Sequence, residues 1–250
     1  MIKPKNILIV RTDRIGDVIL TLPICALLKK QFPDSKISFL LQSYTKPLAE
    51  NNLFIDEVIT LIEENGKPSI IKNVRQLKNR FDLCIIAYPT FSIAVILFLS
   101  KITTRIGTGY RWYSFLFNKR VYEHRKNANH HELEFNIRLL REIGINEVLS
   151  PENVDYGLSV DKDADKIISN ELMGNLINPT DKIVIIHPGS GGSSVDLPVN
   201  KMKELVRNIS QLTNIAIFIT GNENEKELCQ SMVVSKNTFN MAGKLSLQQL

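Results

Sequence analysis

Short apolar runs alternate with amphipathic stretches along the first 100 residues. The apolar runs have the length and composition of strands buried on both faces, and they lie at residues 7–10, 37–41, 57–61 and 83–88. Helical spacing of apolar positions marks the stretches that follow three of them, at residues 18–30, 70–80 and 93–99. Strands separated by helices in this way predict βαβ units and a doubly wound parallel sheet.

The alternation weakens after residue 100 and resumes at residue 182. Further strands are predicted at residues 182–187, 215–220 and 239–241, and further helices at 132–143, 164–176, 198–212 and 223–233. Gly144 is the expected C-cap of the helix at 132–143, and Ser246 is the expected start of one more helix. We therefore expect a first domain at residues 1–155, an interdomain connection at 156–180 and a second doubly wound domain at 181–250.

The second of these domains is expected to be incomplete. Its sequence predicts three strands, whereas a doubly wound nucleotide-binding domain usually has about five or six. Such a domain would leave an open sheet edge and uncovered apolar faces. We therefore expect weak or absent catalysis from these 250 residues alone.

One uncharged stretch of eighteen residues, 83–100, approaches the length of a membrane span. Pro89 divides it, which favours a buried strand followed by a short buried helix. The start of the sequence leads directly into a strand-like run, so no signal peptide is expected there, and Cys25, Cys84 and Cys229 lie far apart among apolar residues. These features are typical of reduced core thiols in a cytoplasmic protein.

The composition, 44% hydrophobic and 23% charged with a net charge of +5, is that of a globular protein that favours anionic partners. The positive charge is concentrated in residues 101–131, which hold seven Lys or Arg, one acid, three of the four histidines and the only tryptophan, Trp112. Such a segment can bind phosphate or carboxylate and pack rings on sugars, and a solvated basic face is the alternative. No zinc motif is present, because Phe135 stands where H-E-x-x-H requires its second histidine, and no metal site is expected.

A first candidate site lies between the first strand and the first helix, in the sequence Arg-Thr-Asp-Arg-Ile-Gly-Asp at residues 11–17. In open parallel sheets, ligands bind beyond the carboxyl ends of the strands, and this loop lies there. Gly16 permits close approach of the chain, and Asp17 falls in the first helical turn. Asp17 is either a proton acceptor or an acid that stabilises the start of its helix, and the residues alone leave both open.

A second candidate site is the glycine-rich sequence His-Pro-Gly-Ser-Gly-Gly-Ser-Ser at residues 187–194, ahead of a predicted helix. Glycines and hydroxyls at this position expose backbone N–H groups that can bind phosphate. It is neither a P-loop nor a G-x-G-x-x-G fingerprint, since no Gly-Lys-Ser/Thr follows and Ser194 replaces the third glycine. A flexible turn is the alternative.

Together these pieces resemble glycosyltransferase family 9, the ADP-heptose:lipopolysaccharide heptosyltransferases. The similarity is carried by the order and spacing of residues 9–18, 21–23, 104–107, 131–136, 187–191, 220–225 and 242–247. It implies a GT-B-like fold of two Rossmann-like domains, the first for the acceptor and the second for a nucleotide sugar. It also implies an inverting transfer that uses no metal or other cofactor.

The resemblance assigns roles to individual residues. Asp17 matches the catalytic base that removes a proton from the acceptor hydroxyl. The donor, ADP-heptose on this scheme, would contact Ser190, Gly191, Gly192, Ser193, Gly221, Glu225, Met241 and Gly243. The acceptor, an anionic lipopolysaccharide inner core or other glycolipid, would contact Thr12, Arg14, Gly16, Arg105, Arg111 and Arg125. A lipid-linked acceptor implies peripheral contact with the inner face of the cytoplasmic membrane.

The chain departs from the family pattern in two places. Val195 stands three positions before Pro198, where the family usually has a basic residue, and Leu197 replaces the family's tryptophan. Lys201 lies about a turn too late to supply the missing cation, which would offset charge on the leaving group. The family's Asp-Thr/Ser-Gly-Pro-x-x-His motif is expected just after Leu250.

Two other functions remain open at this stage. One is a truncated, non-catalytic remnant or binding module that still binds anionic glycan. The other is a nucleic-acid-binding protein that uses the basic segment, although that segment contains no recognition module and we expect no nucleic acid partner.

Overall fold

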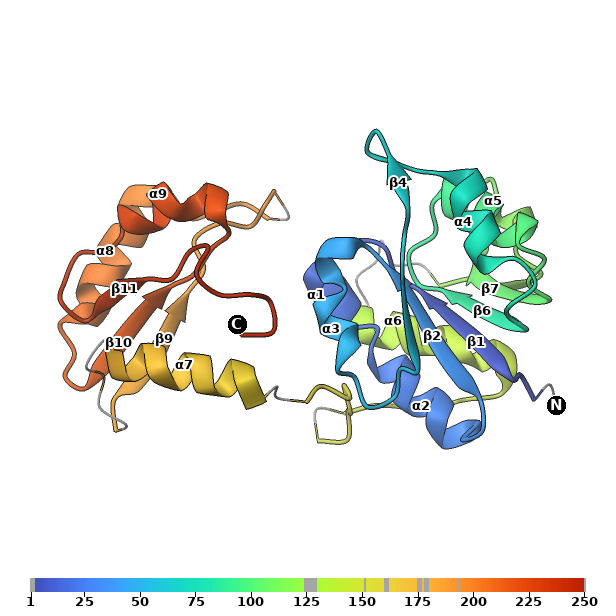
Figure 1. Cartoon of the computed structure of the whole chain (residues 1–250), viewed down its shortest axis with the longest axis horizontal. Coiled ribbons are helices and arrows are strands. Elements are labelled where there is room, and N and C mark those ends of the chain that lie inside the picture. Colours follow the sequence, from blue (N-terminus) through green and yellow to red (C-terminus); the bar gives the residue numbers. More distant parts are fainter. Residues whose placement is uncertain are drawn as a thin grey trace. The chain divides into compact units, whose positions relative to one another are not determined.

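The computed structural model describes residues 3–123, 130–150, 152–159, 162–174, 177, 180–192 and 194–249, without the side chains of residues 162 and 171–173. The chain divides into two compact units, Met1–Ser159 and Val160–Leu250 (Figure 1). Each unit is a parallel sheet with helices, so the fold is α/β of the GT-B-like, Rossmann-like class that the sequence predicts.

The first unit contains a six-stranded sheet in the order β3-β2-β1-β6-β7-β8, and all neighbouring strands are parallel. The strands are β1 (Asn6–Val10), β2 (Lys36–Leu41), β3 (Glu57–Thr60), β6 (Leu83–Ile86), β7 (Thr104–Thr108) and β8 (Lys119–Val121). In the register, Ile7 lies between Ile37 and Leu83. The strand order reverses between β1 and β6, which is the point where open parallel sheets bind ligands.

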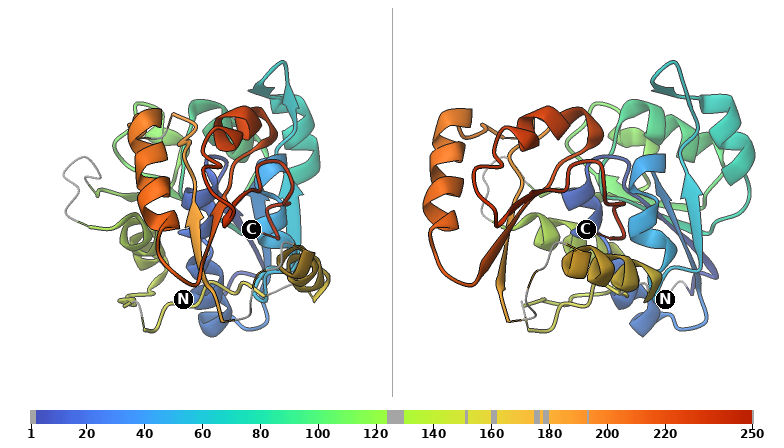
Figure 2. Two further views of the ribbon diagram at one scale, coloured as in Figure 1. Left: turned by 90° about the vertical axis from the view of Figure 1, so that its left-hand side faces the viewer. Right: turned by 60° about the vertical axis from the view of Figure 1, so that its left-hand side comes forward.

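Alternating side chains of the central strand pack against two different helical layers. Ile7 and Ile9 face α2 and α6, whereas Leu8 and Val10 face α4 and α5. Both faces of β1 are therefore apolar, which explains the continuous apolar run in its sequence. Figures 1 and 2 show helices on both faces of this sheet.

The helices of this unit follow the predicted pattern, except that one predicted helix is divided in two and the short helix Pro47–Glu50 was not predicted. They are α1 (Ile15–Ile19), α2 (Pro23–Gln31), α3 (Pro47–Glu50), α4 (Ile70–Leu77), α5 (Phe91–Leu99) and α6 (Glu132–Arg138), the last continued by a 3-10 turn, Leu139–Ile143. The single helix predicted at 18–30 is two helices, because Pro23 has no N–H to continue the first and suits the start of the second. Gly144, at φ 85°, ends the 3-10 turn in the left-handed conformation and confirms the predicted C-cap.

Two strands, β7 and β8, were not predicted from the sequence. They lie inside the basic segment, where Arg105, Gly107 and two cations of β8 obscure the apolar pattern. A small hairpin of β4 (Glu63–Glu64) and β5 (Lys67–Pro68) was also missed, although Asn65 and Gly66 between them have the positive φ angles of a tight hairpin turn.

The second unit contains a three-stranded parallel sheet in the order β11-β10-β9. Its elements are α7 (Lys162–Gly174), β9 (Lys182–Ile186), α8 (Val199–Ser210), β10 (Ile215–Ile219), a 3-10 turn (Glu223–Glu225), α9 (Lys226–Gln230) and β11 (Thr238–Asn240). Edge strand β9 exposes Ile183 and Ile185, as expected for an open sheet edge. The helix expected from Ser246 is not formed over residues 246–249, which make a turn in which the Ser246 N–H donates to Gln249 Oε1 at 2.8 Å.

The uncharged stretch 83–100 forms β6 and α5. A helix of nine residues is roughly 14 Å long, about half the thickness of a bilayer core. Within the described ranges, the chain has no helix with the length and apolarity of a membrane span. The three cysteines are free and buried, and burial raises the pKa of the Cys25 and Cys84 thiols.

One carboxylate, Asp56, lies directly before β3 and joins it to the start of β2 and to α2. Asp56 accepts hydrogen bonds from the Ile37 N–H at 2.7 Å and pairs with Lys29 Nζ at 2.7 Å. Burial alone would raise the pKa of Asp56, but the Lys29 and Ile37 bonds outweigh it and lower the pKa. A lowered folded-state pKa contributes stability above the unfolded pKa, and this stability disappears as the pH falls through the folded value.

We therefore expect Asp56→Asn to lower the free energy of unfolding at pH 7 by about 0.5–1 kcal/mol, a small value because the pair is partly exposed. The difference from the wild type should shrink as the pH falls below about 4, where the wild-type carboxylate becomes protonated. Urea unfolding at pH 7 and pH 3 measures it, with Asp34→Asn in the exposed turn before β2 as the control. A difference that grows in acid would contradict this interpretation.

Candidate active site

A buried arginine, Arg11, lies directly after β1 at the point where the strand order reverses. Its backbone N–H donates to the Leu40 carbonyl at 3.0 Å, which continues the ladder with β2. Only 2% of the residue is exposed. A buried guanidinium requires partners for its charge and its five N–H donors.

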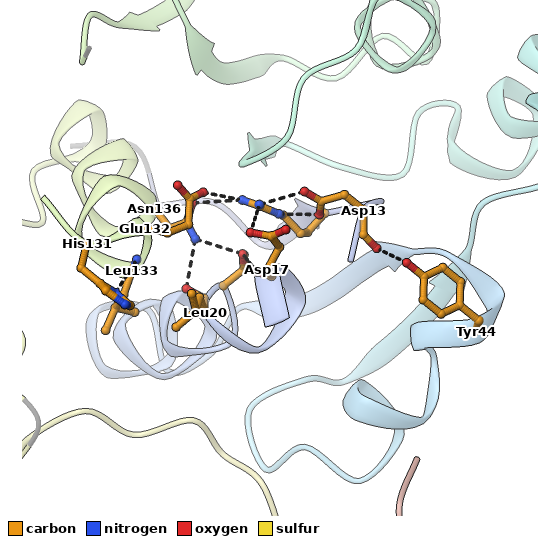
Figure 3. A network of polar contacts seen from close by, with 10 residues as sticks. Asp13, Asp17, Leu20, Tyr44, His131, Glu132, Leu133 and Asn136 are labelled. Atoms are coloured by element: carbon orange, nitrogen blue, oxygen red, sulfur yellow. Dashed lines mark hydrogen bonds and ion pairs between the residues drawn. The ribbon is translucent and has the colours of Figure 1, made fainter. Parts of the chain in front are cut away.

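Three carboxylates surround this guanidinium (Figure 3). Asp13 binds it through two oxygens, at 2.6 Å from Nε and 2.8 Å from Nη2. Asp17, on α1, lies 2.8 Å from Nη2, and Glu132, at the start of α6, lies 2.9 Å from Nη1. With all groups ionised, one cation and three anions leave the cluster at a net charge of −2.

Asn136 links this cluster to the turn between α1 and α2. Its Oδ1 accepts from Arg11 Nη1 at 3.3 Å, and its Nδ2 donates to the Leu20 carbonyl at 3.0 Å and to Thr21 Oγ1 at 3.2 Å. Thr21 Oγ1 in turn donates to the Asp17 carbonyl at 2.8 Å. These bonds connect α6 to α1, so Asp17 and Glu132 are held on a common frame (Figure 3).

The start of α6 is set by its N-cap. His131 Nδ1 accepts from the Leu133 N–H at 3.3 Å, and Glu134 reaches back to the His131 N–H at 3.4 Å. This reciprocal arrangement is a capping box with histidine in place of Ser or Thr. It starts the helix at Glu132, whose carboxylate contacts Arg11.

The cluster perturbs two of its own members. Burial alone would lower the pKa of Arg11, but hydrogen bonds and charge from Asp13, Glu132 and Asp17 outweigh it and raise the pKa. Burial raises the pKa of Asp13, with a further rise from the charge of Asp17, against the opposing effect of Arg11. Arg11 is therefore permanently charged, and the three carboxylates around it share the hydrogen bonds and the positive charge of one guanidinium.

The cluster forms one wall of a cleft of about 660 Å³ in the first unit. The cleft is lined by Arg11, Asp13, Asp17, Glu132 and Phe135 together with Tyr88, Pro89, Thr108, Tyr110, Arg111 and Glu123. Arg138 and Arg141 bind Glu123, at 2.9 Å and 3.5 Å. Arg111, by contrast, forms no ion pair with any carboxylate in the described ranges, so its charge remains available to a ligand.

The structure brings some of the predicted acceptor residues to this cleft and not others. Asp17, one-third exposed, and Arg111 line it. Thr12 is buried, whereas Arg14 and Gly16 are exposed on the same loop but do not line the cleft. Space is open around Gly16, so packing within the protein does not require glycine there.

Two more predicted acceptor residues lie elsewhere. The Arg105 guanidinium donates to the carbonyls of Ile102 and Leu116 and lies over the Phe98 ring, so it joins α5 to the following loop and does not line the cleft. Arg125 lies outside the described residues.

Sequence reasoning did not assign roles to Arg11, Asp13, Glu132 or Asn136, although all four lie in segments that it singled out. A usable signal was present, because a charged residue directly after a fully apolar strand must be buried or paired. The partner could not be read from spacing, since Glu132 is 121 residues away from Arg11.

In the second unit, the loops after β9, β10 and β11 meet at the carboxyl edge of the sheet. His187 Nδ1 lies 3.1 Å from Thr220 Oγ1, and the Gly243 N–H donates to the Gly221 carbonyl at 3.0 Å. A Cβ on Gly189 would overlap Oε1 of Glu225, so the first and second loops are in close contact at a glycine. The loop that holds Ser190 and four further predicted donor residues therefore belong to one region: Gly221, Glu225, Met241 and Gly243.

The glycine-rich loop itself closes through its own polar groups. The Ser190 N–H donates to Asp196 Oδ1 at 3.0 Å, and Ser190 Oγ donates to the Ser194 carbonyl at 3.0 Å. Gly191 and Gly192 adopt φ angles of 57° and 80°, which glycine alone adopts without strain. Ser193, also predicted to bind the donor, lies outside the described residues.

Val195, which stands where a basic residue was expected, is 98% exposed next to this loop. No group of three His, Cys, Asp or Glu in the described part of the chain has the arrangement of a metal site.

Comparison with known proteins gives a family and a set of similar folds. A protein-family model described as glycosyltransferase family 9 (heptosyltransferase) matches residues 70–250. Lipopolysaccharide heptosyltransferase 1 of Campylobacter coli is 24% identical over 261 residues, covering 98% of this chain and 74% of the relative.

Two crystal structures superpose over 98% of the chain. The glycosyl transferase family 9 protein of Veillonella parvula has a TM-score of 0.84 at 19% identity, with 71% of its own chain covered. The ADP-heptose lipopolysaccharide heptosyltransferase II of Escherichia coli has a TM-score of 0.77 at 20% identity, with 74% covered. At these identities the superpositions establish the fold.

The Arg11 cluster leads to a stability prediction. Arg11→Met should lower the free energy of unfolding at pH 7 by about 3 kcal/mol, because it leaves three neighbouring carboxylates without their cation. Mutual repulsion would then raise the folded-state pKa values of these acids above their unfolded values. The folded state would take up protons, so the variant should regain stability as the pH falls from 7 towards 4.

Urea unfolding across that pH range measures both effects. Arg75→Met, which removes an exposed arginine of α4, is the matched control and should change stability little. If Arg11→Met lowers the free energy of unfolding as much at pH 4 as at pH 7, then the arginine does not stabilise the fold by charge pairing.

Proposed function

Because the chain belongs to glycosyltransferase family 9, we propose that it transfers a sugar, heptose from ADP-heptose, to an anionic inner-core lipopolysaccharide acceptor. The observation that carries this proposal is the position of Asp17. Its carboxylate lies in a cleft at the switch point of a parallel sheet, paired with a buried arginine 2.8 Å away and still one-third exposed.

In the proposed reaction, Asp17 is the general base. The acceptor hydroxyl oxygen attacks C1 of the sugar as its proton passes to the Asp17 carboxylate, and the bond from C1 to the diphosphate oxygen breaks. The electron pair leaves with the nucleoside diphosphate, so a single displacement inverts the configuration at C1. No metal takes part in this scheme, and no cofactor is required besides the nucleotide-sugar substrate.

The frame around Asp17 supports this role. Arg11 orients the carboxylate, and Asn136 and Thr21 hold the turn behind α1, so the base is positioned before the acceptor arrives. Asp13 and Glu132 share the same guanidinium, so Arg11 does not neutralise Asp17 alone. The surplus negative charge of the cluster favours acceptance of a proton as the reaction proceeds.

The loops of the second unit support the donor part of the proposal. Backbone N–H groups of the loop from Ser190 to Ser193 would bind the diphosphate, and Gly221, Glu225, Met241 and Gly243 would contact the nucleoside. Heptose is proposed because the relatives named above are a lipopolysaccharide heptosyltransferase and an ADP-heptose heptosyltransferase.

The acceptor part rests on Arg111. It lines the same cleft as the anionic Arg11 cluster and forms no ion pair with any described carboxylate. An anionic acceptor group would therefore bind at Arg111, with the hydroxyl turned towards Asp17. Because such an acceptor is lipid-linked, we place the protein in the cytoplasm, in peripheral contact with the inner membrane face.

Two observations favour the second candidate, a non-catalytic module that binds anionic glycan. The Asp196 carboxylate occupies the Ser190 N–H, and Val195 supplies no positive charge beside it. Both features weaken the site for a leaving diphosphate.

The role of Asp17 is tested by Asp17→Asn. We expect the rate of ADP release from ADP-heptose with an inner-core acceptor to fall about 10²–10⁴-fold, because an amide cannot accept the proton. Asp34→Asn, in an exposed turn of the same unit, should keep wild-type turnover. Unchanged turnover in Asp17→Asn would exclude Asp17 as the base, and failure of the wild type with every nucleotide sugar would favour the binding module.

The missing cation is tested by Val195→Lys. A lysine beside the glycine-rich loop should tighten ADP binding and raise the transfer rate about tenfold, a fraction of what one well-placed donor contributes at a transition state. Calorimetry with ADP and the transfer assay give the two values. Val148→Lys adds the same charge at an exposed valine of the first unit and should change neither, and an equal gain in both variants would reveal only a general charge effect.

A further inference from the structure

Helix α5 is apolar on its outer face as well as on its inner face. Its inner side chains Ile93, Ala94, Ile96 and Leu97 are buried in the core against β6 and α4. The outer positions are Phe91, Phe98 and Leu99, each close to half exposed. A surface helix of a globular protein normally carries polar residues on its outer face, so α5 lacks the pattern of a helix that faces water.

The loop after β7 adds two larger exposed rings to this face. Trp112 is 73% exposed and Phe115 is 63% exposed. Trp112 lies against Phe91 at the start of α5, with the ring centroids 4.8 Å apart. Tyr113 holds the loop in this position. Its buried ring contacts the rings of Phe91 and Trp112, and its hydroxyl donates to the Pro89 carbonyl at 2.7 Å.

The packing of the loop explains why these rings point outward. Phe117 and Leu116 fill the core beneath, and the Ser114 hydroxyl donates to the Thr108 carbonyl at 2.6 Å. Because these buried residues fill the core beneath the loop, the rings of Trp112 and Phe115 lie outside it. We call the exposed side chains of Phe91, Phe98, Leu99, Trp112 and Phe115 the aromatic face.

The chain around the aromatic face is strongly basic. Residues 65–122, which include α4, α5 and the loop, contain ten Lys or Arg and one acid, Asp82, although the whole chain has a net charge of only +5. The Asp82 carboxylate accepts hydrogen bonds from the backbone N–H groups of Lys5 and Asn6. In the described part of the chain, Lys72, Arg80 and Lys119 are the members of this group that form ion pairs.

Several of the remaining cations adjoin the aromatic face. Lys101 follows the last turn of α5, and Arg105 lies over the Phe98 ring at 5.4 Å. Arg75 is exposed on α4, which packs beside α5, as Figure 1 shows. The face is thus a group of apolar side chains, mostly rings, near cations that form no ion pair with a described carboxylate.

We propose that the aromatic face docks on an anionic lipid surface, with its rings among the lipid headgroups and its bordering cations on the anionic groups. Rings with neighbouring Lys and Arg are the composition that membrane interfaces select. The aromatic face lies next to the cleft in the chain. Pro89, Tyr110 and Arg111 line the cleft that holds Asp17, and they adjoin Phe91 and Trp112 in the chain.

A lipid-linked acceptor would therefore enter the cleft from the surface on which the aromatic face rests. This consequence depends on the proposed function, whereas the docking itself does not. A protein partner or a second copy of the chain is the rival occupant, but the nearby cations match an anionic lipid surface better than they match an identical, equally basic face.

Trp112 is the only tryptophan, so its fluorescence reports on this face alone. Vesicles of phosphatidylcholine with about one-quarter phosphatidylglycerol should shift its emission to shorter wavelength and carry the protein into the pellet on centrifugation. Vesicles of phosphatidylcholine alone should do neither to a comparable extent, and added salt should weaken the binding to anionic vesicles. These vesicles contain no sugar acceptor, so the result does not depend on transferase activity.

Two double variants separate the contributions of rings and charge. The double variant Trp112→Ser/Phe115→Ser should bind anionic vesicles about tenfold more weakly, or weaker still, in the sedimentation assay. The double variant Arg75→Glu/Lys101→Glu should lose affinity to a similar extent. The matched controls are Leu53→Ser, which removes an exposed leucine elsewhere in the first unit, and Lys236→Glu in the second unit, and both should bind as the wild type does. Circular dichroism confirms that each variant is folded.

Three results would overturn the proposal: no sedimentation with anionic vesicles, sedimentation without a shift in Trp112 emission, or equal loss in the control variants. A change in sedimentation velocity of the free protein on substituting Trp112 and Phe115, with vesicle binding retained, would instead assign the face to a protein contact. Vesicle binding by a protein that transfers no sugar would refute the proposed function and leave the docking surface intact. With a soluble, delipidated core acceptor, the Trp112 and Phe115 variant should keep wild-type turnover.

Discussion

The first unit depends on the requirement that a buried guanidinium be paired. Arg11 is placed at the end of the central strand by the β1–β2 ladder, in a position where water cannot neutralise it. The three carboxylates and Asn136 that satisfy it come from the loop after β1, from α1 and from α6. The ion pairs and hydrogen bonds of Arg11 therefore hold together the three segments that form one wall of the cleft.

This arrangement places charges of both signs in one cleft of the first unit. The part of the cleft around Asp17 is anionic, Arg111 lines the same cleft, and the loop that follows Arg111 carries exposed aromatic residues. These features follow from different physical constraints: pairing of a buried cation, the lack of an ion pair to Arg111 among the described residues, and anchoring of a loop by Tyr113 that leaves Trp112 outside.

Agreement between sequence and structure differs from element to element. The apolar run of β1 predicted its strand because both faces of a central strand are covered, and Gly144 was found as a C-cap because a left-handed residue favours glycine. Strands β7 and β8 were missed because the polar and glycine residues near the sheet edge break the apolar run. The basic charge of Arg105 suggested a ligand contact, but its guanidinium binds two carbonyls of its own unit.

The sequence by itself determined the fold class and the candidate loops, because periodicity, turn residues and strand ends are local features of the chain. With the family resemblance, the sequence also offered Asp17 as a candidate. It did not determine which groups surround Asp17. That was decided by tertiary structure, since parallel β1 and β6 and the packing of α6 bring Glu132 and Asn136 more than a hundred residues along the chain to Arg11. The outward direction of Trp112 was decided in the same way, because only the packed core shows that Tyr113, Leu116 and Phe117 fill the space beneath it.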